Sequence, residues 1–230
     1  MRTLAIGDIH GCLRAFDTLL EMVSPTLDDT LVTLGDYVDR GPDSRGVIER
    51  LLSLEKFTQF VPLRGNHEEM MCAARDGRAD LHFWMRVGGD ETVASYGVPI
   101  DPFDLEQDGE GLRNGVPQAH WDFLFQRCGD AYETDDHIFV HAGVVPDKPL
   151  DAHARRELLW PKFQDRGPHQ SGKRVICGHT PQHNGIPLNV GHTVVVDTWV
   201  YDLIGWLTCF DVESGHYWQA NQQGDRREGN

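Results

Sequence analysis

Short apolar segments alternate with polar, glycine-containing turns along most of this chain. Five segments are four or five residues long and largely β-branched, which is typical of buried strands; they cover residues 3–6, 30–34, 59–63, 137–140 and 174–177. Between several of them, apolar side chains recur every three or four positions, as on one face of a helix, over residues 13–23 and 47–52. This alternation predicts an α/β fold with polar residues gathered at the carboxyl ends of the strands.

Each of the five segments is followed by a short motif that joins glycine to oxygen or imidazole groups. The motifs are Gly-Asp-Ile-His-Gly (7–11), Gly-Asp-Tyr-Val-Asp-Arg-Gly (35–41), Arg-Gly-Asn-His-Glu (64–68), His-Ala-Gly (141–143) and Gly-His-Thr (178–180). Glycine permits sharp turns where the backbone leaves a strand and passes close to a ligand. A single Gly-Asp pair indicates only a tight turn, but five such motifs together predict a shared site.

The motifs offer carboxylate, amide and imidazole groups without any thiolate. This mixture suits divalent manganese, iron or zinc better than a structural, sulfur-bound zinc. One carboxylate can bridge two ions, and two ions roughly 3.5–4 Å apart can share a hydroxide and brace a phosphoryl displacement. We therefore expect a centre of two divalent ions, preferably Mn²⁺, with the candidate ligands Asp8, His10, Asp36, Asn66, His141 and His179.

Together and in this order, the motifs from Gly7 to Thr180 resemble those of the metal-dependent phosphoprotein phosphatases, especially the compact bacterial and phage members. The resemblance implies a calcineurin-like metallophosphoesterase fold, in which two mixed β-sheets are flanked by helices in a four-layer αββα sandwich. It also implies a serine/threonine protein phosphatase that hydrolyses phosphomonoesters directly, by attack of a hydroxide held by the two metals.

The same resemblance divides the ligands between two metals. Asp8, His10 and Asp36 hold the first metal, and Asp36 bridges to the second. The second metal is completed by Asn66, His141 and His179. On a strand that continues through residue 9, Asp8 and His10 would face the same side, which agrees with this assignment.

The resemblance also assigns the catalytic and phosphate-binding residues. His67 protonates the leaving alkoxide, and Asp39 orients His67; a nearby carboxylate favours the charged imidazole. Arg40 and Arg64 bind the phosphoryl oxygens, because the planar guanidinium matches them bidentately. A further arginine is usual before the Gly-His-Thr motif, but Lys162 stands there and lacks the fork. The alternatives for that role are Arg156 and Arg166.

Two other features bear on the surroundings of the site. Residues 196–199 read Val-Asp-Thr-Trp where Asp-Thr-Gly is usual in the family, so Trp199 predicts a different loop geometry. An apolar insert over residues 83–97 is typical of core packing. The resemblance places a comparable insert beside the active site, so Trp84 and Tyr96 are candidates for a substrate wall.

Composition restricts the classes of binding partner and the cellular compartment that we expect for this protein. The formal net charge of −15 disfavours nucleic acid as a partner, because phosphate backbones attract basic surfaces. No apolar run reaches the roughly 20 residues that span a membrane, and the first strand begins too early for a signal sequence. Five cysteines without CxxC spacing indicate a reducing compartment. We expect a cytoplasmic protein with one catalytic domain over residues 1–220 and a frayed tail over residues 221–230.

Three functions are compatible with these motifs. The first is the phosphatase, acting on phosphorylated proteins or peptides and also on small phosphoesters. The second is a symmetrical dinucleoside tetraphosphate (Ap4A) hydrolase, although residues 38–40 and Glu68 are closer to the protein-phosphatase pattern. The third, a catalytically silent scaffold, is disfavoured because all six ligands, Asp39 and His67 are retained. The physiological substrate and the oligomeric state stay open.

Overall fold

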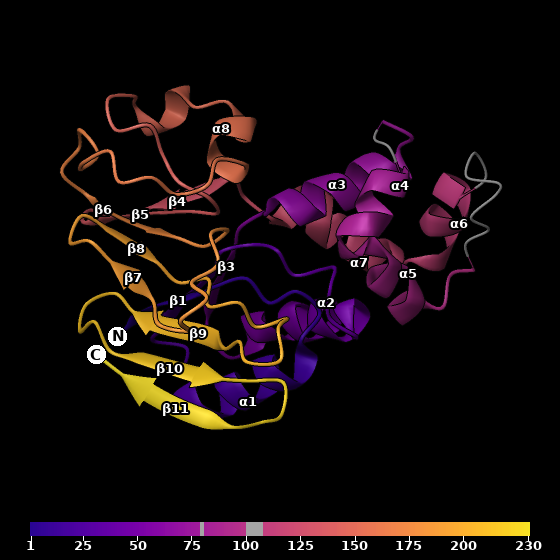
Figure 1. The fold of residues 1–230 in the computed structure, drawn as a ribbon, viewed down its shortest axis with the longest axis horizontal. Coiled ribbons are helices and arrows are strands. Elements are labelled where there is room, and N and C mark those ends of the chain that lie inside the picture. Colours follow the sequence, from indigo (N-terminus) through magenta and orange to yellow (C-terminus); the bar gives the residue numbers. More distant parts are fainter. Residues whose placement is uncertain (79–80, 100–107) are drawn as a thin grey trace.

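Two β-sheets form the centre of the molecule, and the computed structural model describes residues 1–78, 81–99 and 108–230 (Figure 1). In chain order the strands are β1 (Thr3–Ile6), β2 (Thr30–Thr33), β3 (Gln59–Pro62), β4 (Ala131–Glu133), β5 (His137–Val140), β6 (Arg174–Cys177), β7 (Leu188–Asn189), β8 (Thr193–Val195), β9 (Leu207–Asp211), β10 (Tyr217–Ala220) and β11 (Arg226–Gly229). One sheet has six strands in the order β11-β10-β9-β1-β2-β3, and the other has five in the order β4-β5-β6-β8-β7.

Both sheets are mixed, as predicted. In the six-stranded sheet, β1, β2 and β3 run parallel, and β9, β10 and β11 continue it with antiparallel pairs. In the five-stranded sheet, β5, β6 and β8 are parallel, and β4 and β7 pair antiparallel at its edges. The parallel strands put their carboxyl ends at the same edge of each sheet, which is where α/β proteins place their functional residues.

Side chains alternate between the two faces of each strand and thereby form separate apolar layers. In β1, Leu4 and Ile6 belong to the layer under the helices, whereas Ala5 lies in the layer between the sheets. In β5, Phe139 joins that middle layer and Val140 belongs to the outer layer of the second sheet. Both faces are buried, which explains why these strands are continuous apolar runs in the sequence.

Helices cover the outer faces of the two sheets and also form a lobe beside them. Their bounds are α1 (Leu13–Val23), α2 (Ser44–Ser53), η1 (Leu54–Lys56), α3 (Asn66–Arg75), α4 (Leu81–Trp84), η2 (Met85–Gly89), α5 (Asp90–Tyr96), α6 (Asp108–Gly115), α7 (Gln118–Asp122), η3 (Phe123–Arg127), η4 (Leu150–Ala152) and α8 (Arg155–Leu159). Helices α1 and α2 pack on the six-stranded sheet and α8 packs on the other, which gives the expected four-layer αββα sandwich (Figure 1).

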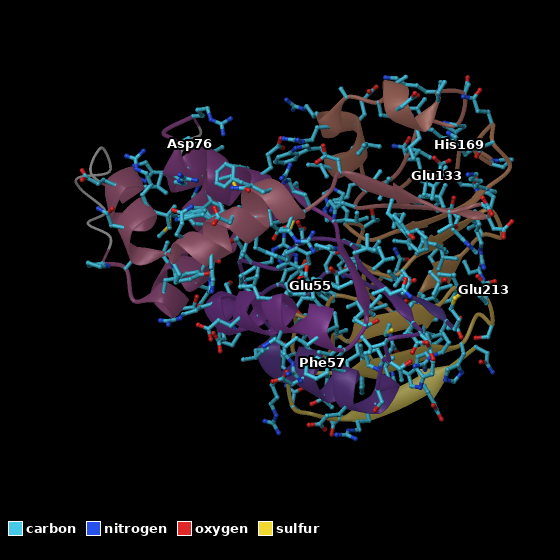
Figure 2. The ribbon with its side chains drawn as sticks, turned by 180° about the vertical axis from the view of Figure 1, so that it is seen from behind. Glu55, Phe57, Asp76, Glu133, His169 and Glu213 are labelled. Atoms are coloured by element: carbon cyan, nitrogen blue, oxygen red, sulfur yellow. The ribbon has the colours of Figure 1, made fainter. Side chains whose placement is uncertain are left out.

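The helices from α3 to η3 form the helical lobe, which lies to one side of the sandwich (Figure 1). Figure 2 shows the molecule from behind, with Asp76 on this lobe and Glu133 and Glu213 on the sandwich. The lobe is attached through its first helix, because α3 begins directly after the loop that follows β3. It also packs on the sandwich side through α5 and α2.

The predicted strands and helices are present, with strand ends that differ by at most one residue. Helix α1 matches the predicted range, and α2 begins three residues before the apolar repeat. That earlier start has a local cause, because the Asp43 carboxylate accepts the Gly46 N–H at 2.7 Å and caps the helix. The described residues contain no helix long and apolar enough to cross a membrane, and all five cysteines are buried and free.

The expectation of a frayed tail over residues 221–230 is wrong. Residues Arg226–Gly229 form β11, which pairs antiparallel with β10 at the edge of the six-stranded sheet. Arg227 anchors this strand, because its Nε donates to the Gln219 Oε1 at 2.6 Å and its guanidinium lies 4.0 Å from the Trp206 ring centre. A polar strand at a sheet edge has no apolar pattern. The composition of residues 221–230 is therefore also typical of an unstructured terminus.

Candidate metal centre and active site

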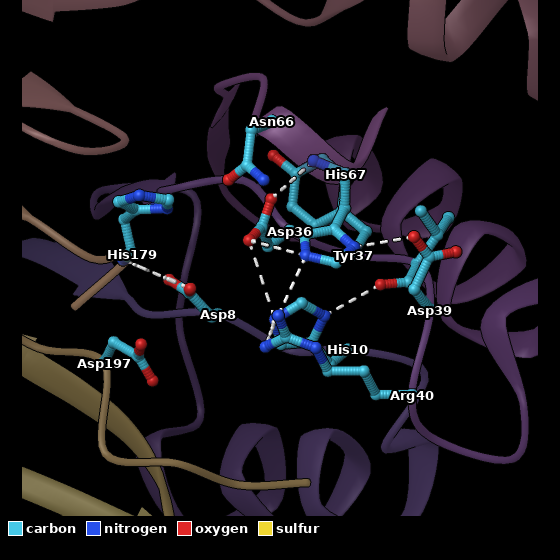
Figure 3. A network of polar contacts seen from close by, with 12 residues as sticks. Asp8, His10, Asp36, Tyr37, Asp39, Arg40, Asn66, His67, His179 and Asp197 are labelled. Atoms are coloured by element: carbon cyan, nitrogen blue, oxygen red, sulfur yellow. Dashed lines mark hydrogen bonds and ion pairs between the residues drawn. The ribbon is translucent and has the colours of Figure 1, made fainter. Parts of the chain in front are cut away.

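The five motifs follow β1, β2, β3, β5 and β6, and the structure brings side chains of the first, second, third and last motifs together (Figure 3). The fourth joins them through His141, whose Nε2 lies 2.9 Å from Asn66 Oδ1 and 3.1 Å from His179 Nδ1. The first and second motifs are joined where the Asp36 carbonyl accepts the N–H groups of Ile9 and His10. The first and last are joined where the His179 N–H donates to the Asp8 carboxylate, at 3.0 and 3.1 Å across 171 positions of sequence. Residues from both sheets therefore share one site.

Two groups of side chains within this site have the spacing of metal ligands. His10, Asp36 and His67 form one group, and Asp36, His141 and His179 form the other; the ligand atoms of each lie within 4.8 Å of one another. Asp36 belongs to both, which is the bridging position predicted for it. We call His10, Asp36, His141 and His179, together with Asn66, the metal-binding cluster.

Asn66 and Asp8 extend these groups in different ways. Asn66, the first residue of α3, places its Oδ1 2.9 Å from His141 Nε2 and so adds an oxygen to the second group. Among the described residues, Asp8 is in neither group, and His67 stands in the first group where Asp8 was predicted. The Asp8 carboxylate is buried beside the cluster and receives the His179 N–H.

Three imidazoles are oriented by backbone carbonyls in a way that suits metal binding. Each directs one ring nitrogen at a carbonyl oxygen: His10 Nδ1 at Val38 (2.9 Å), His141 Nδ1 at Leu34 (2.8 Å) and His179 Nε2 at Trp160 (2.9 Å). The opposite nitrogens of His10 and His141 then face Asp36, at 3.6 and 3.5 Å. Since a carbonyl can only accept, the inward nitrogen of each neutral ring carries the lone pair, as in metal-ligating histidines.

The protonation states also fit divalent cations. Burial lowers the pKa of His10 and His141, and it lowers that of His179 to about 3, so burial favours the neutral form of these rings. Burial alone would raise the pKa of Asp36, but the surrounding imidazoles outweigh this and lower it. Burial, Asp197 and Asp36 raise the pKa of Asp8. Bound cations would favour the charged carboxylates and keep the imidazoles unprotonated.

His67 and Asp39 form a buried pair at the edge of the cluster (Figure 3). His67 Nδ1 lies 2.6 Å from Asp39 Oδ2, and its Nε2 lies 3.9 Å from Asp36 Oδ2. Burial by itself lowers the pKa of His67, but Asp36 and the hydrogen bond with Asp39 outweigh it and raise the pKa. The pair therefore presents a protonatable nitrogen to the cluster.

The predicted phosphate-binding residues occupy different positions. Arg40 reaches the cluster, with Nη1 3.0 Å from His10 Nε2 and Nη2 3.1 Å from His67 Nε2. Lys162 is exposed, and its Nζ donates to the His179 carbonyl at 2.6 Å, next to the cluster. Arg156 and Arg166, the alternatives to Lys162, are exposed.

The structure does not bring Arg64 to the cluster, contrary to our expectation. Its buried guanidinium donates to the carbonyls of Leu124 (2.9 Å) and Phe125 (3.1 Å) and to Asp130 Oδ1 (3.2 Å). These acceptors lie in η3 and just after it, where a cation is favoured. Arg64 therefore fastens the end of the helical lobe to the sandwich.

The expectation that Trp84 and Tyr96 line a substrate wall is also wrong, because both side chains are buried. Tyr96 Oη is 2.8 Å from His120 Nδ1 inside the lobe. Trp84 Nε1 donates to Asp39 Oδ2 at 2.8 Å and so supports the His67–Asp39 pair from behind.

Glu68 is a positioning residue whose role the motifs did not predict. Its buried carboxylate accepts four backbone N–H groups: Asp36 (2.8 Å), Tyr37 (2.7 Å), Val38 (3.2 Å) and Gly65 (2.8 Å). It thereby joins the second and third motifs. Burial, followed by the charge of Asp36, raises the pKa of Glu68 to about 7. The sequence signal was its place three residues after Gly65 at the start of α3, as in a capping box.

Tyr201 and Trp199 complete one side of the site, and the motifs gave no role to Tyr201. The Arg40 guanidinium lies 4.3 Å from the Tyr201 ring centre, and the same ring contacts His10 edge-on at 5.0 Å. Trp199 adopts φ 66°, the left-handed conformation that the usual glycine would favour, and packs against His183 at 4.2 Å. The different loop geometry predicted for Trp199 is therefore not seen in its φ angle, which is one that glycine would also adopt.

Backbone strain is concentrated at this site. Of the described non-glycine residues with positive φ, five are motif residues: His10, Asp36, Asp39, Arg40 and His179. Such conformations cost about 1–3 kcal/mol each and persist where the surrounding structure imposes them, which is typical of functional sites.

Residues 1–195 match the family model described as calcineurin-like phosphoesterase. The chain belongs to this family. A curated relative of this phosphoesterase, named serine/threonine-protein phosphatase 1 from Salmonella typhimurium (strain LT2), is 40% identical over 188 residues, or 76% of this chain and 77% of the relative. The family depends on a dinuclear metal centre, and the cluster supplies candidate ligands for it.

A second relative has a different name. It is called symmetrical bis(5′-nucleosyl)-tetraphosphatase, from Nitrosomonas europaea, and is 28% identical over 187 residues, or 80% of this phosphoesterase and 60% of the relative. A solved structure described as a candidate diadenosine tetraphosphatase has a TM-score of 0.64 and 20% identity, covering 100% of this chain and 94% of that chain. This likeness shows the fold alone.

Proposed function

We propose that this phosphoesterase is a serine/threonine protein phosphatase. The observation that carries the proposal is the His67–Asp39 pair at the cluster, with His67 Nδ1 2.6 Å from Asp39 and Nε2 facing Asp36. A serine or threonine alkoxide is a poor leaving group, so a protonated imidazole here lowers the barrier to its departure. His67 donates this proton, and Asp39 holds the ring and stabilises its positive charge.

We further propose that two divalent ions, preferably Mn²⁺, are held by Asp8, His10, Asp36, Asn66, His141 and His179. The neutral imidazoles, the buried carboxylates and the position of Asp36 in both ligand groups support this assignment. When bound, the ions act as Lewis acids at the phosphoryl oxygens and make a bound water more acidic. His67 is assigned to proton transfer because Asp36 and the hydrogen bond with Asp39 raise its pKa, whereas burial lowers the pKa of His10, His141 and His179.

Arg40 and Lys162 are the proposed phosphate-binding residues. Arg40 lies at the cluster, and the Tyr201 ring supports its planar fork, which can hold two phosphoryl oxygens. Lys162 adds a second positive charge next to His179 but not a bidentate contact. The net charge of −15 makes nucleic acid an unfavourable partner, so we propose phosphorylated proteins or peptides and small phosphoesters as substrates.

We propose one catalytic domain, since the motifs from Gly7 to Thr180 all contribute to one site. It extends beyond residue 220 to β11, which belongs to the six-stranded sheet. The five free cysteines favour a reducing compartment, and we propose the cytoplasm.

Symmetrical dinucleoside tetraphosphate hydrolysis is the second candidate, and the relative from Nitrosomonas europaea favours it. The match covers 77% of the phosphatase from Salmonella typhimurium but 60% of the relative from Nitrosomonas europaea, and this larger share favours the phosphatase.

The test compares initial rates on a phosphothreonine peptide and on diadenosine tetraphosphate. The protein is stripped with a chelator and reloaded with Mn²⁺, and bound metal is measured in the same sample. We expect Mn²⁺-dependent turnover of the peptide to exceed cleavage of the dinucleotide. Preference for the dinucleotide would replace the proposed substrate and keep the metal centre. If two ions bind but neither ester is cleaved, both candidate functions fall.

A further inference from the structure

The Asp39 carboxylate is held by side chains of the helical lobe as well as by His67. Trp84, the last residue of α4, donates its Nε1–H to Oδ2 at 2.8 Å, the oxygen that His67 also contacts. Thr92, in α5, donates its hydroxyl to Oδ1 at 2.7 Å. Trp84, Thr92 and Asp39 are each 0% exposed, so no water competes for these bonds. Both oxygens of Asp39 are therefore fixed.

The lobe also holds the backbone of the same loop. In the lobe, Thr92 Oγ1 accepts the Asp39 N–H at 2.8 Å and the Gly88 carbonyl accepts the Arg40 N–H at 3.0 Å. Ser44 Oγ, in α2, lies 3.1 Å from the same Asp39 nitrogen. Asp39 and Arg40 have φ angles of 74° and 71°, two successive left-handed residues. Such a pair is unfavourable on its own and needs outside contacts to persist.

The two hydrogen bonds from the lobe restrict how the Asp39 carboxylate can turn. A carboxylate bound only to His67 can rotate about its Cβ–Cγ bond and carry the imidazole with it. With Trp84 on Oδ2 and Thr92 on Oδ1, that rotation would break a buried hydrogen bond, which costs free energy. The His67 ring is thereby kept with Nε2 facing Asp36 and the cluster. Proton donation requires this placement, because the donor must lie within hydrogen-bonding reach of the leaving oxygen.

We propose that Trp84 and Thr92 are positioning residues for proton donation by His67, acting through Asp39, so that the helical lobe is part of the catalytic apparatus. The proposal rests on the proposed function, in which His67 protonates the leaving group. It makes a specific demand on the substrate. A serine alkoxide must be protonated as it leaves, whereas p-nitrophenolate is stable enough to leave without a proton.

The experiment measures kcat on a phosphoserine peptide and on p-nitrophenyl phosphate, with bound metal quantified for every variant. Trp84→Phe removes the N–H and keeps an aromatic ring. Its matched control is Trp121→Phe, the same change at another buried tryptophan of the lobe, whose Nε1 donates at 3.4 Å to the Arg113 carbonyl. Thr92→Val removes the hydroxyl at nearly constant shape, and Thr92→Ser keeps it.

We expect Trp84→Phe and Thr92→Val each to lower kcat on the peptide by about tenfold and on p-nitrophenyl phosphate by less than about twofold. Bound metal should stay unchanged, and Trp121→Phe and Thr92→Ser should resemble the unmodified protein. In a His67→Asn background, Trp84→Phe should cause no further loss on the peptide, because a residue that acts through His67 has nothing left to position.

Two sets of results would overturn the inference. If Trp84→Phe lowers both activities equally, or adds its full effect to His67→Asn, Trp84 supports the fold and not the proton donor. The proposed function would then survive, provided that His67→Asn alone lowers mainly the peptide activity. If His67→Asn lowers both activities equally, or the peptide is never cleaved, the proton-donor assignment and this inference fall together.

Discussion

In the metal-binding cluster, imidazoles are oriented by backbone carbonyls, whereas in the His67–Asp39 pair the carboxylate is oriented by side chains. His10 and His141 each direct one nitrogen at a main-chain oxygen of the loop after β2, and His179 directs one at the Trp160 carbonyl at the end of α8. Asp39 depends instead on the lobe. A hydrogen bond to a main-chain carbonyl survives most side-chain substitutions, whereas a hydrogen bond from a side chain is lost when a substitution removes the donor atom. The two halves of the site should therefore fail separately: one through metal loss, the other through turnover with metal retained.

The largest effect should come from Asp36→Asn, because Asp36 is the residue common to both ligand groups. The amide cannot supply the negative charge that a bridging position between two cations requires. We expect less bound metal and at least about a thousandfold lower turnover, measured by elemental analysis and initial rates. The matched control is Asp197→Asn, a buried carboxylate outside both groups, which should keep two ions. Unchanged stoichiometry in Asp36→Asn would contradict the bridge.

His67→Asn should affect only the His67–Asp39 half of the site, and so lower turnover without loss of metal. The variant removes the proton donor, so turnover of a phosphoserine peptide should fall by about two to four orders of magnitude with both ions retained. Elemental analysis and steady-state rates on the same sample check this. Because His67 also lies in the first ligand group, loss of one ion would instead show that it is a ligand and erase the distinction between the halves.

Gly88→Ala tests whether the backbone of the lobe matters as well as its side chains. Gly88 has φ 112°, and a Cβ there would lie 2.5 Å from the Arg40 nitrogen. We expect the free energy of unfolding to fall by about 1–3 kcal/mol and kcat to fall on both esters, because Arg40 is displaced too. Denaturant unfolding and rates measure these effects.

The control for this change is Gly97→Ala in the same lobe. Gly97 has φ 67°, but a Cβ there would meet nothing within 4 Å. It should cost about 1 kcal/mol of stability and leave kcat unchanged. Equal loss of kcat in both variants would mean that general weakening of the lobe, and not its contact with Arg40, limits turnover.

The smallest effect should come from Asp29→Asn, far from both halves. Arg2 donates to Asp29 through its N–H and its guanidinium, and this lowers the pKa of Asp29 below its usual range. A lowered folded-state pKa means that the stabilisation is present near neutral pH and is lost as the pH falls from about 4 toward the folded-state pKa. We expect the variant to be about 1 kcal/mol less stable at pH 7 but equal to the unmodified protein in strong acid, with unchanged kcat. If the difference in stability between the two proteins stayed constant across pH, the charge of Asp29 would not be its cause.

The strands and the cluster could be predicted because their signals are local. An apolar run identifies each strand, and glycine with a carboxylate or imidazole directly after it identifies a turn at the strand end. Asp36 and His141 follow such runs, and the structure places them in one group. Their metal occupancy and roles stay predictions, since they depend on ions and substrate.

The supports around the cluster could not be predicted, because their partners are distant in sequence. Arg64 and Arg40 both follow strands as basic motif residues, yet the partners of Arg64 lie 60 to 66 positions away, in η3 and just after it. Trp84 was indistinguishable from core packing, since its hydrogen bond to Asp39 spans 45 positions. Only the folded chain shows that one arginine faces the cluster and the other a helix end.

The C-terminal strand has a consequence for self-association. β11 forms the outer edge of the six-stranded sheet, and its first residues, Arg226, Arg227 and Glu228, are charged. A second chain could extend the sheet there only by bringing its own strand against these charged side chains. The charged edge strand therefore disfavours edge-to-edge aggregation. Removing residues 221–230 would expose the edge of β10 with its aromatic residues Tyr217 and Trp218. The shortened protein would then be prone to pair with itself while its catalytic groups are intact.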